Sequence, residues 1–496
     1  MCRFSLVLYL CLITSHGQAN DRYDIFDMSL AELATIEIAS KHKQTVYSSP
    51  STVSIISRTQ LSNMGVFDLQ TLLNYVPGFQ STRDIEQGTS NRITSRGRST
   101  ALSESVLVQI DGNKINDLYT GGISIINRML SLGNVDRVEI IRGPGSALYG
   151  GNAFLGVVNI VTASNLSQVN FSTDDKGSML SNLLYHNESN SIDIFVSTFN
   201  SKGDTYRFVD LYGINTPTKD PMTGHDFYLK YQVDHWQFIG RHMQRELNDF
   251  LPLGSLGNNI NEENTEQWSL TSQYEYEVTP SSLLKLKAHY SKDKWRTNVL
   301  LIPKEVEIAP DFSLSHDFIG GPYLTSHSLK IDGELTYHFS EKQLITIGSA
   351  FEQVEIDNVY TNTTHNLTTL EPYPSAIKLT GENSFNVLKK RNIASLFIQD
   401  QIKLSTQWEL TAGLRFDDYD DFGQTLNPRF SFIWKPNKTS SLKLLYGSAF
   451  RAPNFLELYD KNNYVDFGNV NLSPEEVKTF ELGWINTTDN WHWEMT

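Results

Sequence analysis

Hydrophobic and polar residues alternate along most of the second part of this chain. In residues 192–197, Ile192, Ile194 and Val196 occupy every second position. A period of two predicts a strand with one apolar face. The same pattern returns in pairs of segments around short turns, at 268–276 with 284–290, 329–339 with 344–354, and 393–402 with 408–416. These pairs predict antiparallel hairpins, and we count roughly fourteen to fifteen strands in all.

The connections between these strands alternate in length. Short turns are predicted at 187–190, 279–282, 340–342 and 435–439, and long polar loops at 202–225, 245–265, 292–326, 355–391 and 452–475. Tryptophans stand near the predicted strand ends, at Trp236, Trp268, Trp408, Trp434 and Trp491. Short turns on one side, long loops on the other and aromatic residues between them are typical of a transmembrane β-barrel. We therefore assign residues 166–496 to such a barrel.

Residues 51–165 have a different pattern and predict a small α+β domain. Val53, Ile55 and Ile56 indicate a short strand. Asp68 can cap a helix whose apolar residues share one face and which Pro77-Gly78 ends; these residues are Leu69, Leu72, Leu73 and Val76. Another strand at 106–110 turns at Asp111-Gly112 or Gly112-Asn113.

The stretch 135–162, VDRVEIIRGPGSALYGGNAFLGVVNIVT, is the most specific in the chain. It predicts two strands joined by a tight connection whose backbone conformation requires glycine. The motif residues of this connection are Gly143, Pro144, Gly145, Tyr149 and Gly150. The spacing from Gly145 to Gly150 is that of a phosphate-binding loop. Such a loop continues with Lys and then Ser or Thr, whereas this chain has Gly151 and Asn152, which argues against nucleotide binding.

This stretch resembles the end of the plug domain in TonB-dependent outer-membrane transporters of Gram-negative bacteria. The resemblance continues through the barrel region, notably at Phe450-Arg451-Ala452-Pro453; other matching segments are 396–400, 413–417, 427–429 and 471–475. It implies a plug, here residues 51–165, inside an antiparallel barrel that in this family has about 22 strands. It also implies a location in the bacterial outer membrane.

The N-terminal region contains two further expected segments. Residues 1–19 have a basic start, an apolar core and small residues before a cleavage site, as in a signal peptide. Both cysteines of the chain, Cys2 and Cys11, lie in this segment. Residues 20–50 form a polar leader with one alternating run, Ile36, Glu37, Ile38, Ala39 and Ser40. The resemblance implies that this run, which we call the coupling segment, is a TonB box that adds as a strand to TonB. The alternative is a disordered leader with a chance alternation.

Two arginines of the plug stand before glycines, at Arg96 and Arg142. The resemblance implies that they pair with carboxylates on the inner barrel wall and lock the plug. Glu352 and Asp400 are the expected partners. The alternative is that both arginines lie in solvent, where an ion pair contributes little.

Composition and motifs exclude several other functions. The net charge of −15 argues against binding to nucleic acid. No histidine, cysteine or carboxylate pattern matches a catalytic or metal motif, and the acidic run at 417–421 lacks the spacing of a calcium loop. We therefore expect a protein that is not an enzyme and that uses no cofactor and no metal.

A plugged barrel implies gated transport. The resemblance implies that TonB and its inner-membrane energising complex drive uptake of a small-molecule ligand, by default a ferric siderophore, with cobalamin or haem as alternatives. Haem fits less well, because no histidine lies between Phe450 and Glu475 to bind its iron. A second hypothesis is a passive porin or adhesin. A third is a non-functional truncated product, because residue 496 falls at the start of a predicted strand near Trp491.

Overall fold

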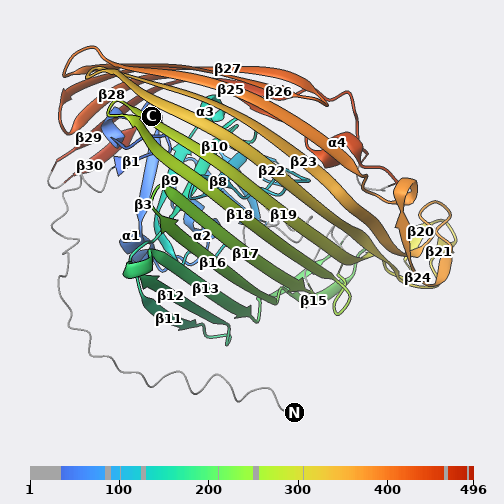
Figure 1. Ribbon diagram of the computed structural model, residues 1–496. Helices are drawn as coiled ribbons and strands as arrows, with labels where there is room; N and C mark the ends of the chain where they lie inside the picture. The colour runs from blue at the N-terminus through green and yellow to red at the C-terminus, as the bar shows by residue number, and fades with distance from the viewer. Residues whose placement is uncertain are drawn as a thin grey trace.

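The computed structural model describes residues 35–83, 91–100, 102–123, 130–210, 212–249, 256–304, 306–462, 467–488 and 491–496. A long antiparallel sheet curves around a smaller domain, which lies in its hollow (Figure 1). This arrangement confirms the predicted fold class. The predicted signal peptide, residues 1–19, lies outside the described residues.

The smaller domain, the plug, is built on a mixed five-stranded sheet in the order β3-β9-β10-β7-β8. Its strands are β3 (Val53–Ser57), β7 (Val106–Ile110), β8 (Asn113–Lys114), β9 (Val135–Arg142) and β10 (Gly156–Thr162). Asp111 and Gly112 both have positive φ, at 48° and 74°, so the turn after β7 is the Asp111-Gly112 one. A second sheet contains β4 (Phe79–Arg83), β5 (Asn91–Ser95) and β6 (Arg98–Ser99).

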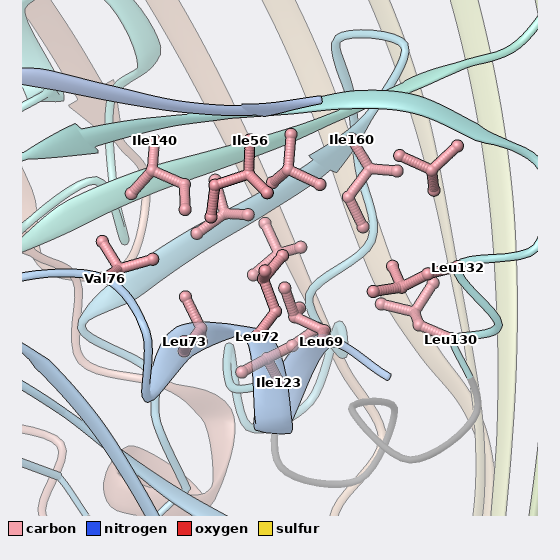
Figure 2. Close-up of a cluster of buried hydrophobic side chains, with 14 of the residues drawn as sticks. Ile56, Leu69, Leu72, Leu73, Val76, Ile123, Leu130, Leu132, Ile140 and Ile160 are labelled. Atoms are coloured by element: carbon pink, nitrogen blue, oxygen red, sulfur yellow. The ribbon is translucent and has the colours of Figure 1, made fainter. Parts of the chain in front are cut away.

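Two helices cover the plug sheet. The predicted helix and its cap are confirmed as α2 (Leu69–Leu73), with the Asp68 carboxylate accepting from the Thr71 N–H at 2.8 Å. The helix is shorter than predicted, because Val76 lies beyond its last residue. Its apolar face packs under β7, β9 and β10 in the plug core (Figure 2). A second helix, α1 (Arg58–Met64), was not predicted and begins with a capping box formed by Ser57 and Gln60. In the described part of the chain, no helix is long and apolar enough to cross a membrane.

Truncation of Leu72 is expected to loosen the plug. Leu72 is fully buried in the core, so Leu72→Ala removes apolar contacts and leaves a cavity, at a cost of about 2–5 kcal/mol. Amide hydrogen exchange of β7 and β10 should therefore quicken, while that of the barrel strands stays the same. Leu388→Ala, at a position that is 58% exposed, is the matched control. Unchanged exchange in the Leu72 variant would contradict this account of the core.

The curved sheet joins its strands in sequence order, each antiparallel to the next, with β24 (Pro372–Thr380) beside β23. The strands are β11 (Gln168–Thr173), β12 (Met179–Asn187), β13 (Ile192–Ser201), β16 (Met222–Val233), β17 (Trp236–Asn248), β18 (Glu262–Thr279), β19 (Ser282–Ile302), β22 (Phe318–Ser340), β23 (Gln343–His365), β25 (Lys389–Lys403), β26 (Trp408–Tyr419), β27 (Gly423–Asn437), β28 (Ser440–Arg451), β29 (Glu475–Thr487) and β30 (His492–Met495).

Side chains alternate between the two faces of this sheet as the pattern predicts. Leu270 and Ile331 are exposed on the outer face, whereas Thr271 and Ser328 are buried on the inner one. This is the apolar-out, polar-in arrangement of a membrane barrel. Of the five tryptophans, Trp268 departs from the expected position, because it lies well inside β18.

Four of the five expected long loops are shorter than predicted, whereas the expected loop at 452–475 does connect β28 to β29. The range 292–326 is largely strand, because β19 continues to Ile302 and β22 begins at Phe318. Here the strands extend beyond the region with an apolar outer face, so alternation no longer marks them. The loops also contain small elements of their own: β14 (Thr205–Val209), β15 (Asn215–Lys219), β20 (Glu307–Ala309), β21 (Phe312–Ser313) and α4 (Phe455–Tyr459).

Candidate functional site

The glycine-rich stretch of the plug forms a tight crossing between β9 and β10. Gly143 has φ 139° and Gly150 has φ 76°, and the short helix α3 (Ser146–Tyr149) stands between them. A Cβ at Gly143 would lie 2.7 Å from the Oε1 of Glu481 on β29. Gly143 therefore combines a backbone conformation that favours glycine with close approach of a barrel carboxylate. Pro144 and Gly145 complete the turn.

The coupling segment is folded back in this structure. β1 (Thr35–Ile36) pairs with β2 (Gln44–Thr45), and the chain turns after Ile36, with the Lys41 N–H donating to the Glu37 carbonyl at 2.7 Å. The expectation of an extended strand over residues 36–40 is thus wrong for this conformation. Tertiary contacts hold the backbone in a turn that the alternating pattern does not reveal.

Polar groups of the plug and the barrel hold the backbone of the coupling segment. The Ile38 N–H donates to the Glu139 carboxylate at 3.1 Å, and the Tyr149 hydroxyl donates to the Ile38 carbonyl at 2.7 Å. Arg429 of β27 donates to the Ala39 carbonyl at 3.1 Å. Ile36, Ile38 and Ala39 are buried. Burial raises the pKa of Glu139, and the neighbouring Arg137 opposes that rise.

Removing the Tyr149 hydroxyl is expected to loosen the coupling segment. Tyr149→Phe deletes the hydrogen bond to the Ile38 carbonyl, which contributes about 1 kcal/mol, or roughly a fivefold change in the docking equilibrium. A cysteine introduced by His42→Cys should then react faster with a thiol reagent. Tyr75→Phe, at an exposed position of the plug, is the control and should leave the rate unchanged. Equal rates in both variants would show that the hydroxyl does not hold the segment.

Both plug arginines face barrel carboxylates, but not the expected ones. Arg96 Nη1 lies 2.7 Å from Glu481 Oε1 on β29, and Arg142 pairs with Glu494 on β30. Arg96 also donates to the Arg142 carbonyl at 2.5 Å. The prediction of Glu352 and Asp400 as partners is wrong: Glu352 accepts from Ser328 at 2.9 Å, and Asp400 accepts from Gln343 at 2.9 Å. The local sequence pattern does not define how the plug is rotated inside the sheet.

The barrel motif connects the end of β28 to the plug and to an outer loop. The Phe450 N–H donates to Ser146 Oγ at 3.2 Å, which fixes the strand to α3. Arg451 donates to Glu457 of α4 at 2.8 and 2.9 Å and to Glu475 at 3.2 Å. Ala452 is buried, and the Pro453 carbonyl accepts from Arg391 Nη2 at 2.9 Å.

A buried cluster at the outer end of the plug was missed by the sequence analysis. The Tyr119 hydroxyl donates to Asp460 and accepts from Asn386 Nδ2 at 2.8 Å. The Phe455 N–H donates to the Tyr119 carbonyl at 3.1 Å. The cluster thus ties the plug to two outer loops, those that follow β24 and β28. We find no sequence signal for it, because its members come from three distant segments.

The acidic run is used in ion pairs. Asp417 accepts from Arg415 at 2.7 Å, and Asp421 lies 2.6 Å from Arg391 Nη2. Among the described residues, no three His, Cys, Asp or Glu side chains form a group that could hold a metal ion.

Comparison with known families agrees with this architecture. Residues 45–157 match the TonB-dependent Receptor Plug Domain, and residues 189–496 match the TonB dependent receptor-like β-barrel. The chain belongs to the TonB-dependent receptor family. This receptor is therefore a protein of the Gram-negative outer membrane, and its family consists of transporters and receptors rather than enzymes.

The receptor is similar to proteins with different ligands in their names. It is 25% identical over 472 residues to the vitamin B12 transporter BtuB of Vibrio cholerae, covering 92% of this chain and 68% of that one. It is also 25% identical over 505 residues to the ferric enterobactin receptor of Pseudomonas aeruginosa, covering 91% and 65%. The solved siderophore receptor PirA of Acinetobacter baumannii has a TM-score of 0.65 at 19% identity, covering 88% and 68%. This last likeness concerns the fold alone.

Proposed function

We propose that this receptor imports a scarce small-molecule ligand across the outer membrane, with energy supplied by TonB acting on the coupling segment. The docked segment carries the proposal. It lies in the half of the sheet that leads to the short connections, because Lys41, directly after it, pairs with Glu334 in the second half of β22. Ile38 is bonded to Glu139 in the middle of β9, so a pull on the segment acts on the plug sheet.

We propose a ferric siderophore as the ligand, with cobalamin as the alternative. Basic side chains lie over aromatic rings near the outer loops: Lys389 Nζ is 4.6 Å from the ring centroid of Tyr459, and Lys378 Nζ is 4.5 Å from that of Tyr360. Such pairs suit an anionic, aromatic iron chelate. Relatives named for cobalamin and for ferric enterobactin are equally similar to this chain, which keeps both ligands in the test.

Uptake assays distinguish these ligands and the energy source. Cells producing this chain are given radiolabelled ferric enterobactin or cyanocobalamin, with and without a protonophore. Accumulation of the iron chelate that stops when the proton gradient collapses is the expected result. Uptake that continues with the protonophore would indicate a passive pore, and uptake of cyanocobalamin alone would replace the siderophore. A chain that imports neither probe would overturn the proposal for these ligands.

A further inference from the structure

Direct hydrogen bonds join the plug to barrel strands on both sides of β22 and β23. On one side, Tyr228 of β16 donates to Asp111 at 2.9 Å, and Lys287 of β19 donates to the Gly112 carbonyl at 3.3 Å. The other side has more of these bonds. Arg429 on β27 donates to the carbonyls of Ala39 and Pro50 at 3.1 and 3.0 Å, and Lys443 on β28 donates to the Val46 carbonyl at 2.6 Å. Further direct bonds join Tyr47 to Thr487, Thr52 to Glu481 and Leu148 to Arg415. With the pairs of Arg96 and Arg142, these bonds define strands β26–β30 as the anchored wall.

Strands β22 and β23 pack on the plug at its outer end, where Tyr119 shares an apolar cluster with Leu324 and Val354. Next to this cluster they face the plug across a polar cavity of about 120 Å³. Asn113 and Lys114 line it from the plug, and Ser328, Lys330 and Glu352 line it from the barrel. Three buried polar atoms of its lining have no hydrogen-bond partner in the described part of the chain: Asn113 Oδ1, His289 Nε2 and Asp332 Oδ2. A polar space of this size accommodates several water molecules that can satisfy such groups.

The cavity extends between two contacts that could close it. At one end is Lys41, whose Nζ lies 2.9 Å from Glu334 on β22 and 4.3 Å from the ring centroid of Phe397. At the other end is Leu118, next to the Tyr119 that ties the outer loops to the plug. The cavity therefore lies between the outer cluster and the residue that directly follows the coupling segment.

We propose that this cavity marks the transit route, and that the plug separates from β22 and β23 while it stays attached to the anchored wall. The Lys41–Glu334 ion pair closes the route on the TonB side. Separating the plug from β22 and β23 parts the apolar contact of Tyr119 with Leu324 and Val354, but among the described residues it breaks fewer direct hydrogen bonds than detaching the anchored wall does. Because Lys41 directly follows the coupling segment, a pull there reaches this ion pair early. The inference rests on the proposed function and specifies its route.

Single cysteines report which wall opens. Cys2 and Cys11 are first replaced by serine. Ser291→Cys and Ser328→Cys then place a thiol in the cavity lining, while Ser431→Cys and Ser441→Cys place one at buried positions of β27 and β28 as matched controls. The purified chain in detergent is titrated with low concentrations of urea, and the modification rate of each thiol is measured. In parallel, cells are treated with the same reagent during import of ferric enterobactin, with and without a protonophore.

In urea, the cavity thiols are expected to react about tenfold faster than the control thiols, because local opening exposes the weaker interface first. In energised cells, the reactivity of the cavity thiols should rise during import, and modification of these thiols should block import of ferric enterobactin. Equal reactivity at all four positions in urea, or faster reaction at the controls, would overturn the route whether or not the cells import the probe. Absence of import overturns the proposed function instead. Import with no change at positions 291 and 328 overturns the route alone.

Discussion

Replacing Ile38 by proline is expected to abolish energised uptake and to leave ligand binding at the cell surface intact. Addition of a strand to TonB uses backbone N–H and C=O groups, and proline has no N–H and a fixed φ. In the docked state the same N–H donates to Glu139, so the substitution also loosens the segment. Loss of uptake with retained binding of radiolabelled ferric enterobactin is the expected pair of measurements.

Two further variants distinguish loss of the contact with TonB from loosening of the docked segment. Ile38→Val keeps the N–H and the branched apolar side chain, so uptake should stay within about twofold of the parent chain. Tyr149→Phe loosens the docked segment without changing its backbone groups, so uptake should persist. If Ile38→Pro still imports ligand, TonB acts on another segment or the transport is passive. If Tyr149→Phe abolishes uptake as well, the docked state itself is required.

The barrel was the part of the fold most open to prediction from the sequence. Lipid on one side and a polar interior on the other make apolar and polar residues alternate along each strand. Leu270, exposed on the outer face, and Thr271, buried on the inner one, show this alternation. The same logic fails where strands extend beyond the apolar band, as in β22 and β23, because their inner face there has buried apolar residues such as Leu324 and Val354. The unpredicted helix α1 did carry a local signal, since Ser57 and Gln60 have the spacing of a capping box.

The contacts of the candidate site could not be predicted in the same way. The motif arginines Arg96 and Arg142 indicated that barrel carboxylates should face them. Which carboxylates these are, Glu481 and Glu494, depends on how the plug is rotated inside the sheet. That rotation depends on many contacts between distant segments, such as those of Lys443 with Val46 and Ser51. Alternation indicated the coupling segment, but its docked turn depends on Glu139 and Tyr149.

Charge reversal at Arg142 is expected to detach this edge of the plug from the anchored wall. Arg142 and Glu494 are largely buried, with side-chain exposures of 11% and 19%, so Arg142→Glu places two carboxylates together in a poorly solvated contact. Breaking a buried pair costs about 3–5 kcal/mol, and we expect the lower part of that range because some solvent reaches both groups. Faster hydrogen exchange in β9 and leakage of a large antibiotic into cells measure the effect.

A double-mutant cycle tests whether the two charges act on each other. Arg142→Glu combined with Glu494→Arg should recover part of the loss, with a coupling energy of about 1–2 kcal/mol, because the reversed pair can re-form. Recovery stays incomplete, because Arg96 also binds the Arg142 carbonyl and Glu481 in the original geometry. The exposed pair Lys176–Asp204 is the matched control, and its reversal should change stability by less than about 1 kcal/mol. Additive effects of the Arg142 and Glu494 substitutions would show that this ion pair does not lock the plug.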